Sequence, residues 1–295
     1  MKSEKSILTA FVLNLLFSLL EAAGGILTGS IAILSDAVHD LGDAAGIGIS
    51  YLLEKKSTRR PDSVFTYGYA RYSVLGAAFT SLILLAGSAA VIANAFPRLF
   101  SPPEIDSDGM IFFALFGITV NLIAALLTRE GDSLNQKAVS LHMFEDVLGW
   151  ASVLAGGFLV RFTSLTVFDP LLSIATSLFI IYHASGNMKQ ILGILLEKVP
   201  DGIGTEEIRA HLTEIDGVLD VHHIHIHSLD STFVSASMHI VTDGDSAGIR
   251  HAVRRELNRH GISCITLELE SGNEICAEKE CRPDTKIPVR HCHHH

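Results

Sequence analysis

The residues with the clearest chemical potential are ionisable groups placed inside an apolar stretch. His39 and Asp43 lie four positions apart in "LSDAVHDLGD", and His142 and Asp146 have the same spacing in "SLHMFEDVLGW". Residues i and i+4 lie on one face of an α-helix. The two pairs therefore predict two imidazoles and two carboxylates on two facing helices, a ligand set that suits tetrahedral Zn²⁺.

A purely structural role for these side chains is the alternative, because a single polar residue in a membrane helix often serves helix packing. Each ionisable group costs about 2.5–3.5 kcal/mol at the bilayer centre on the insertion scale. Two identical pairs therefore favour a metal or proton role. The further acids Asp36, Asp40 and Glu21 are candidates for outer contacts of the metal or for an ion path, with polar helix packing as the alternative.

Long apolar runs predict the elements that position these residues. The chain has 295 residues, of which 48% are hydrophobic, and its mean hydropathy is +0.37. A membrane helix needs about 20 apolar residues. Hydropathy predicts a membrane α-helical bundle of six transmembrane helices, at about residues 7–28, 32–53, 74–96, 110–128, 138–160 and 168–185.

Basic residues give the orientation of this bundle. The loop between the second and third predicted spans contains five basic residues, whereas the loops at about 97–109 and 161–167 contain one each. Basic loops tend to stay in the cytoplasm. This bias predicts that the N- and C-termini are both cytoplasmic.

The sequence changes character near residue 199 and predicts three regions: a transmembrane domain at 1–198, a cytosolic domain at 199–271 and a flexible tail at 272–295. In the cytosolic domain, periodicity predicts a compact α+β fold of order α-β-β-α-β. The predicted helices are 205–215, with Thr205 as its cap, and 246–260; the predicted strands are 218–229, 233–242 and 262–270.

Histidines are concentrated in this second half, where 12 of the 15 follow residue 210. Strict strand alternation places His223, His225 and His227 on one face of the first strand, and His222, Ile224 and Ile226 on the other. Any one of them has the alternative of being an ordinary surface residue. His183, His211, His251 and His260 are expected to be interfacial or solvated.

Charge and motifs limit the possible partners and cofactors. The net charge of −10 argues against a nucleic acid partner and suits a protein that handles cations. No G-x-x-x-x-G-K-[ST] loop is present, so no nucleotide cofactor is expected. The tail has Cys276 and Cys281 in "CAEKEC" and ends in "HCHHH", and these soft ligands favour Zn²⁺, unless the final histidines are the remnant of a tag.

Four segments of the sequence resemble one family. "GGILTGSIAILSDAVHDLGD", "FTYGYARYSVLGA", "LHMFEDVLG" and "DPLLS" are similar to the cation diffusion facilitators of the zinc-transporting branch. The resemblance implies a six-span, proton-coupled exporter that forms a homodimer and has a metallochaperone-like, ferredoxin-like cytosolic domain. Its transport ligands map onto the four residues found by spacing, namely His39, Asp43, His142 and Asp146.

The resemblance also implies a cytosolic metal site at His222, His239 and Glu270. Some family members have a further site in the loop between spans 2 and 3, but this chain has Asp62, Phe65 and Tyr69 there, so no metal site is expected. The absence of a histidine-rich insert after the fourth span favours a bacterial or archaeal inner membrane as the location.

Taken together, the sequence predicts an antiporter that exports Zn²⁺ in exchange for protons, rather than an enzyme. Metal binding needs neutral imidazole and ionised carboxylate, so protons and Zn²⁺ compete for the same ligands. Efflux of Co²⁺, Cd²⁺ or Ni²⁺ by the same mechanism is one alternative. An intramembrane zinc hydrolase or a metal sensor is the alternative from a different class of protein.

Overall fold

The computed structural model describes residues 2–28, 31–100, 107–129, 133–163 and 167–272, and the statements below refer to these residues. The chain divides into two compact units, which are described separately. A helical unit comprises residues 1–196 with 229–232, and a sheet unit comprises the rest. The predicted boundary near residue 199 is close to this division but remains a prediction, as does the predicted tail, which lies outside the described residues.

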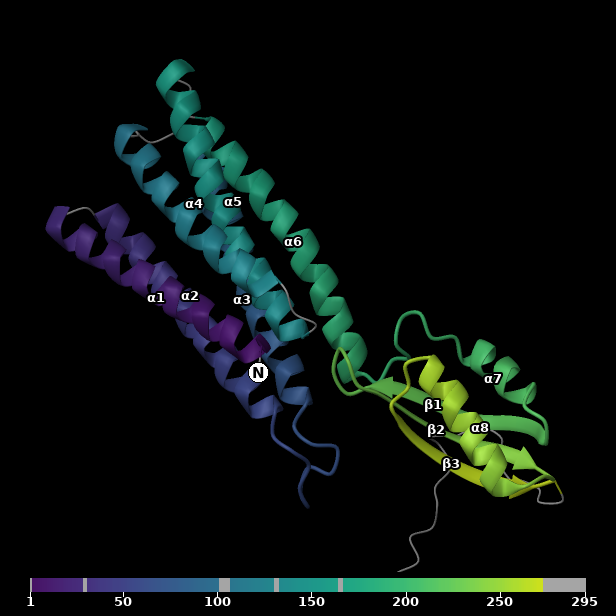
Figure 1. The fold of residues 1–295 in the computed structure, drawn as a ribbon. Coiled ribbons are helices and arrows are strands. Elements are labelled where there is room, and N and C mark those ends of the chain that lie inside the picture. Colours follow the sequence, from purple (N-terminus) through teal and green to yellow (C-terminus); the bar gives the residue numbers. More distant parts are fainter. Residues whose placement is uncertain (1, 29–30, 101–106, 130–132, 164–166, 273–295) are drawn as a thin grey trace, which may run out of the picture. The chain divides into compact units, whose positions relative to one another are not determined.

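The helical unit contains six long helices among the described residues (Figure 1). Each predicted apolar run lies within one of them. Their bounds are α1 (Lys2–Thr28), α2 (Ile31–Ser57), α3 (Arg71–Arg98), α4 (Ser107–Arg129), α5 (Leu134–Thr163) and α6 (Phe168–Leu195). The helices pack mainly in the pairs α1 with α2, α4 with α5, and α3 with α6.

Three of these helices are long and apolar enough to cross a membrane, judged by length and composition over the described residues. These candidate spans are Glu4–Ala23, Arg71–Arg98 and Leu134–Thr163, and a shorter apolar helix covers Ala114–Arg129. A count of six spans is therefore a proposal rather than an observation.

A buried polar network connects α2 with α3 and α5. The Glu54 carboxylate accepts hydrogen bonds from Ser73 Oγ at 2.6 Å and from Asn135 Nδ2 at 3.1 Å. Asn135 Nδ2 also donates to the backbone carbonyl of Ser50 at 3.0 Å. Gly76 leaves room for this amide, because a Cβ there would lie 2.7 Å from Asn135 Oδ1. The network fixes α5 against α2, the two helices that carry the predicted metal ligands.

The sheet unit has the predicted element order: α7 (Thr205–Thr213), β1 (Val218–Ser228), β2 (Val234–Thr242), α8 (Ser246–Arg259) and β3 (Cys264–Ser271). The strands form a sheet of order β1-β2-β3, with β1 and β2 antiparallel and β2 and β3 parallel. The predicted Thr205 cap is wrong, because α7 has Gly204 at its N-cap without a side-chain bond.

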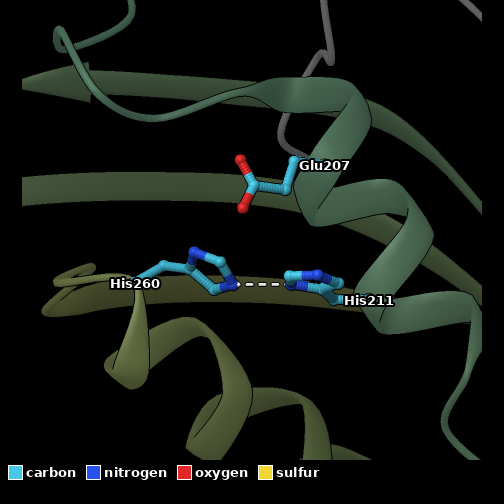
Figure 2. Close-up of side chains that lie close together, drawn as sticks. All are labelled: Glu207, His211 and His260. Atoms are coloured by element: carbon cyan, nitrogen blue, oxygen red, sulfur yellow. Dashed lines mark hydrogen bonds between the residues drawn. The ribbon is translucent and has the colours of Figure 1, made fainter.

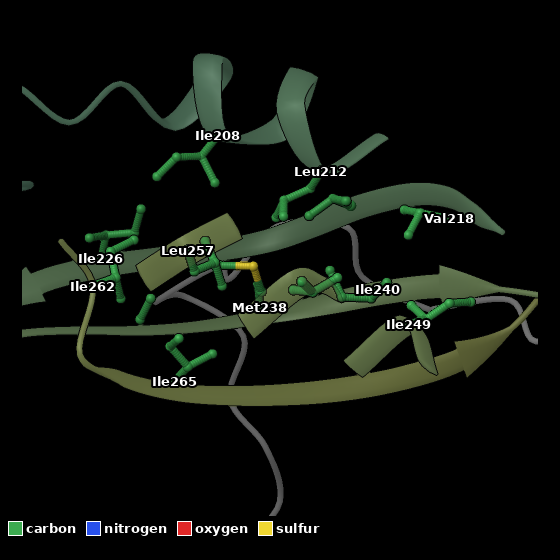
Figure 3. Close-up of a cluster of buried hydrophobic side chains, with 13 residues drawn as sticks. Ile208, Leu212, Val218, Ile226, Met238, Ile240, Ile249, Leu257, Ile262 and Ile265 are labelled. Atoms are coloured by element: carbon green, nitrogen blue, oxygen red, sulfur yellow. The ribbon is translucent and has the colours of Figure 1, made fainter. Parts of the chain in front are cut away.

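Both short helices cover one face of this sheet (Figure 3). The core between helices and sheet is almost entirely aliphatic, and burying each such side chain stabilises the fold by about 1.5–3 kcal/mol. Its members include Ile208 and Leu212 from α7, Val253 and Leu257 from α8, and Val221, Ile226, Met238 and Ile240 from the strands. The sheet unit therefore has a hydrophobic core of its own.

Strand β1 departs from the predicted alternation at a β-bulge. His222 pairs with His239, but the next pair is His225 with Ser237, so His223 and Ile224 together oppose one residue of β2. His223 has a positive φ of 51°, which ordinary strand geometry does not allow. In a regular strand, residues an odd number of positions apart point to opposite faces. Val221 and Ile226 are an odd number of positions apart and are both buried, so the strand needs one extra residue between them. As a result His222 lies on the face opposite the core, and the predicted grouping of His222 with Ile226 is wrong.

Candidate metal centres

The helical unit brings together three of the four predicted transport ligands. Asp43 on α2 and His142 and Asp146 on α5 each direct one ligand atom to a common place, with all three atoms within 4.8 Å of one another. His142 Nε2 lies 3.8 Å from Asp43 Oδ2. We call Asp43, His142 and Asp146 the membrane cluster. Within it, His142 and Asp146 lie on the same face of α5, as their spacing predicts.

The fourth predicted ligand, His39, belongs to α2, as does Asp36. The side chains of residues 24–39 are outside the part of the chain whose side chains the structure describes. The participation of His39 and Asp36 therefore stays a prediction from the sequence.

The environment of His142 is unusual for an imidazole. The residue is 3% exposed, and neither ring nitrogen has a hydrogen-bond partner among the described residues. A buried polar group without a hydrogen bond costs about 1–3 kcal/mol. Coordination of a metal ion through one ring nitrogen would compensate for that cost.

Negative charge accumulates around the same place. Asp40, Asp43, Glu145 and Glu21 all lie near enough to Asp146 to interact electrostatically with its carboxylate. Glu145 also lies close to the imidazole: its Oε2 is 3.9 Å from His142 Nδ1, and Ser88 Oγ donates to its Oε1 at 2.8 Å. Carboxylates concentrated in a buried site need cations, either protons or metal ions, to balance them.

Other polar side chains of the helical unit, among them the ion-path candidate Glu21, are buried as well. Glu21 is 4% exposed, and the amides of Asn14 and Asn121 are 2% and 1% exposed. Both side-chain polar atoms of Asn14 and the Oδ1 of Asn121 make no hydrogen bond within the described residues. The helical unit thus has a polar interior extending over α1, α2, α4 and α5.

The dimensions of the membrane cluster suit a small metal ion. Zn²⁺ binds nitrogen and oxygen at about 2.0–2.2 Å, so two ligand atoms of a tetrahedral site lie about 3.3–3.6 Å apart. The 3.8 Å between His142 Nε2 and Asp43 Oδ2 is close to that separation. Small side-chain movements would bring all three ligands to coordination distance.

The sheet unit gathers the residues of the second predicted site, which we call the sheet cluster: His222, His239 and Glu270. His239 Nδ1 lies 2.5 Å from Glu270 Oε1, and His222 Nε2 lies 3.3 Å from Glu270 Oε2. His222 is 3% exposed and has no hydrogen bond on either ring nitrogen within the described residues. Two imidazoles therefore share one carboxylate on the face of the sheet opposite the helices.

Comparison with known proteins identifies the family of the chain. Residues 7–196 match the family model described as the cation efflux transmembrane domain, and residues 200–272 match that of the cation efflux protein cytoplasmic domain. The chain belongs to the cation efflux, or cation diffusion facilitator, family. Its members are metal cation transporters of membranes and not enzymes.

Named relatives of this cation efflux protein handle several metals. It is 34% identical to the metal cation efflux system protein CzcD of Cupriavidus metallidurans over 82% of this chain and 77% of the relative. It is 30% identical to the zinc transporter ZitB of Yersinia pestis, over 99% and 96%. It is 28% identical to the cadmium, cobalt and zinc/H(+)-K(+) antiporter of Bacillus subtilis, over 99% and 97%.

Three neighbours of the sheet cluster were missed by sequence reasoning. Glu268 Oε2 lies 3.3 Å from His239 Nε2, Asp220 Oδ2 lies 3.5 Å from His222 Nδ1, and the ring of His223 stacks on His239 at 4.7 Å between centroids. Glu268 could have been predicted, because it lies two residues before Glu270 in the same strand and so points to the same face of the sheet. His223 could not, because only the bulge brings it there. The tail residues Cys276 and Cys281 lie outside the described residues.

Proposed function

We propose that this cation efflux protein is a proton-coupled antiporter that exports a divalent cation, foremost Zn²⁺, from the cytosol. The observation that carries the proposal is the membrane cluster, in which a buried imidazole without hydrogen bonds faces Asp43 and Asp146. His39 is the proposed fourth ligand. Two nitrogen and two oxygen ligands suit Zn²⁺, and Co²⁺, Cd²⁺ and Ni²⁺ are the next candidates.

The proposed coupling follows from the chemistry of the ligands. A metal ion needs the neutral imidazole of His142 and the ionised carboxylates of Asp43 and Asp146. Protons bind the same atoms, so protons entering from outside displace the metal, and the metal displaces protons on the cytosolic side. The name of the Bacillus subtilis relative includes H(+) antiport, which supports this exchange. Asp36, Asp40 and Glu21 are proposed to line the ion path.

The proposed setting is a six-span bundle in a bacterial or archaeal inner membrane, with both termini in the cytoplasm. The five basic residues at Lys55, Lys56, Arg59, Arg60 and Arg71 support the orientation. We further propose that the protein is a homodimer. Zn²⁺ at the sheet cluster would offset repulsion between two acidic cytoplasmic domains and raise the transport rate.

Transport in vesicles tests the proposal. Purified protein in liposomes with a trapped Zn²⁺ indicator is given a pH gradient, and Zn²⁺ and H⁺ fluxes are recorded together. We expect Zn²⁺ and protons to move in opposite directions, and we expect Zn²⁺ accumulation to stop when an ionophore collapses the gradient. Zn²⁺ flux that is unaffected by the gradient would show that transport is not coupled to protons.

A further inference from the structure

A third group of metal-binding side chains lies in the sheet unit, on the face of the sheet opposite the sheet cluster. It consists of Glu207 and His211 on α7 and His260, which follows the last residue of α8. Their ligand atoms lie within 4.8 Å of one another. His239 and Ile240 are neighbours in β2 and point to opposite faces, and Ile240 belongs to the core beneath α7 and α8. The two groups are therefore separate sites.

Close contact between the two imidazoles is the central feature of this group (Figure 2). His211 Nδ1 lies 3.0 Å from His260 Nε2, and the Glu207 carboxylate projects from α7 toward the space beside the two rings. Glu256 Oε1 lies 3.8 Å from the same His260 nitrogen. Only one proton can lie between the two facing nitrogens, so one imidazole donates and the other accepts. The Glu207 carboxylate adds negative charge, whereas that of Glu256 is paired with Arg259 at 2.8 Å.

Zn²⁺ fits this arrangement with little movement. At a Zn–N distance of about 2.0–2.1 Å, two imidazole nitrogens of a tetrahedral site are about 3.3 Å apart. The observed separation of 3.0 Å needs to widen only slightly. Glu207 would provide an oxygen ligand, and its spacing from His211 is i, i+4 on one helix face.

The side chains are held in place by the core rather than by the metal. Leu212, next to His211, and Leu257, three residues before His260, are fully buried. The His260 backbone N–H donates to the carbonyls of Glu256 and Leu257 and so ends α8. A site on such supported elements is preorganised for its ligand.

We propose that Glu207, His211 and His260 form a second Zn²⁺-binding site of the cytoplasmic domain, with Glu256 as an outer contact. From the sequence, both histidines were expected to be interfacial or solvated, because they are far apart in sequence and nothing there indicates their contact in the fold. Bound Zn²⁺ would clamp α7 to the end of α8. The site and its metal are independent of whether the protein transports.

Metal stoichiometry of the full-length protein tests this site. The triple variant His222→Ala, His239→Ala and Asp146→Asn serves as the parent, because it lacks the sheet cluster and has a weakened membrane cluster. Bound Zn²⁺ is measured by equilibrium dialysis at micromolar free Zn²⁺. Adding His211→Gln with His260→Gln should remove one Zn²⁺ per chain. Adding His251→Gln, an exposed histidine of α8, should remove none.

Thermal unfolding of the same parent provides the second readout. Zn²⁺ should raise the Tm of the parent and of the His251→Gln control, and the shift should be smaller with His211→Gln and His260→Gln. The tail is identical in all these variants, so any Zn²⁺ that it binds contributes equally to each of them and does not affect the difference. Equal stoichiometry in both variants, a Tm shift as large as that of the parent, or binding only at millimolar Zn²⁺ would overturn the site.

Discussion

The membrane cluster and the sheet cluster use the same chemical groups but are built in different ways. In the helical unit, one turn of α5 provides His142 and Asp146, and α2 adds Asp43. In the sheet unit, three different strands each contribute one ligand, and the pair His239–Glu270 is 31 residues apart in sequence. A helix fixes ligand spacing locally, whereas a sheet fixes it through strand register.

The clusters also differ in what surrounds them. The membrane cluster has further acids, Asp40, Glu145 and Glu21, that interact with Asp146 in a buried environment. In the sheet cluster, the His239 side chain is 25% exposed and Glu268 beside it is 68% exposed. The ligand carboxylates Asp43 and Glu270 are equally buried, with side chains 11% exposed in each case, but the neighbouring carboxylate of the sheet cluster is also stabilised by water. We therefore expect the first cluster to be essential for transport and the second to modulate it.

The largest expected effect is the loss of transport in Asp146→Asn. This change keeps the size of the side chain but removes a ligand charge, so Zn²⁺ flux in vesicles should fall by at least about 100-fold. His222→Ala with His239→Ala should lower the flux by only about 5-fold, the size of a modest coupling between sites. Gel filtration and circular dichroism of each variant serve as controls for folding.

Equal losses in the two variants would contradict this difference between the clusters. Such a result would mean that the sheet cluster lies on the transport pathway itself. A flux of Asp146→Asn equal to that of the wild type would instead show that the membrane cluster is not the transport site.

Sequence reasoning succeeded where the relevant geometry is local. The long helices and the α-β-β-α-β order follow from hydrophobic periodicity, and the shared face of His142 and Asp146 follows from the helical repeat. The Asp245 cap of α8 was not predicted but is equally local, since its carboxylate accepts from Ala247 N and Gly248 N. In such cases residues a few positions apart determine the structure.

Apart from the Thr205 cap, a local error of one residue, the errors arose where distant residues decide the structure. The bulge in β1 exists because the core requires both Val221 and Ile226, and alternation within one strand does not reveal that requirement. The contact between His211 and His260 depends on how α7 and α8 pack on the sheet. Neither feature has a signal in the local sequence.

The bulge itself provides an intermediate test. Deletion of His223 should give a regular strand in which Val221, Ile224 and Ile226 face the core and His222 still pairs with His239. It also removes a non-glycine residue with φ of 51°, a conformation that costs about 1–2 kcal/mol. Zn²⁺ binding by the sheet cluster, measured by competition with a chelator, should weaken by no more than roughly 10-fold, the range of an outer contact.

Deletion of Ser237 is the matched control, because β2, unlike β1, contains no bulged residue that can be removed without changing the pairing of the strands. That deletion should move the residues on one side of it to the opposite face and abolish the Zn²⁺ site. If deletion of His223 were as damaging as deletion of Ser237, the bulge would be required for the cluster and not merely compatible with it.

The smallest expected effect on transport is that of a substitution at Asp62. This residue lies in the loop between α2 and α3, where some family members have a further metal site. Its carboxylate already has internal donors: the backbone N–H groups of Val64 and Phe65, each at 2.8 Å, and the Tyr69 hydroxyl at 2.7 Å. These hydrogen bonds, that from Phe65 foremost, lower the pKa of Asp62 below its ordinary value. The carboxylate is therefore satisfied without a metal.

Because the folded-state pKa of Asp62 is lowered, its contribution to the loop is present above the ordinary aspartate pKa of about 3.9 and is lost as the pH falls through the lower folded value. Asp62 thus stays ionised throughout the range in which histidine titrates, about pH 5–8, and cannot exchange protons there. Asp62→Asn should leave the Zn²⁺ flux within about 2-fold of the wild type and its pH profile unchanged, since only a surface turn is altered. Flux measured across that range checks this expectation, and a shifted profile in Asp62→Asn would place the loop among the proton-coupled groups beside Asp43, His142 and Asp146.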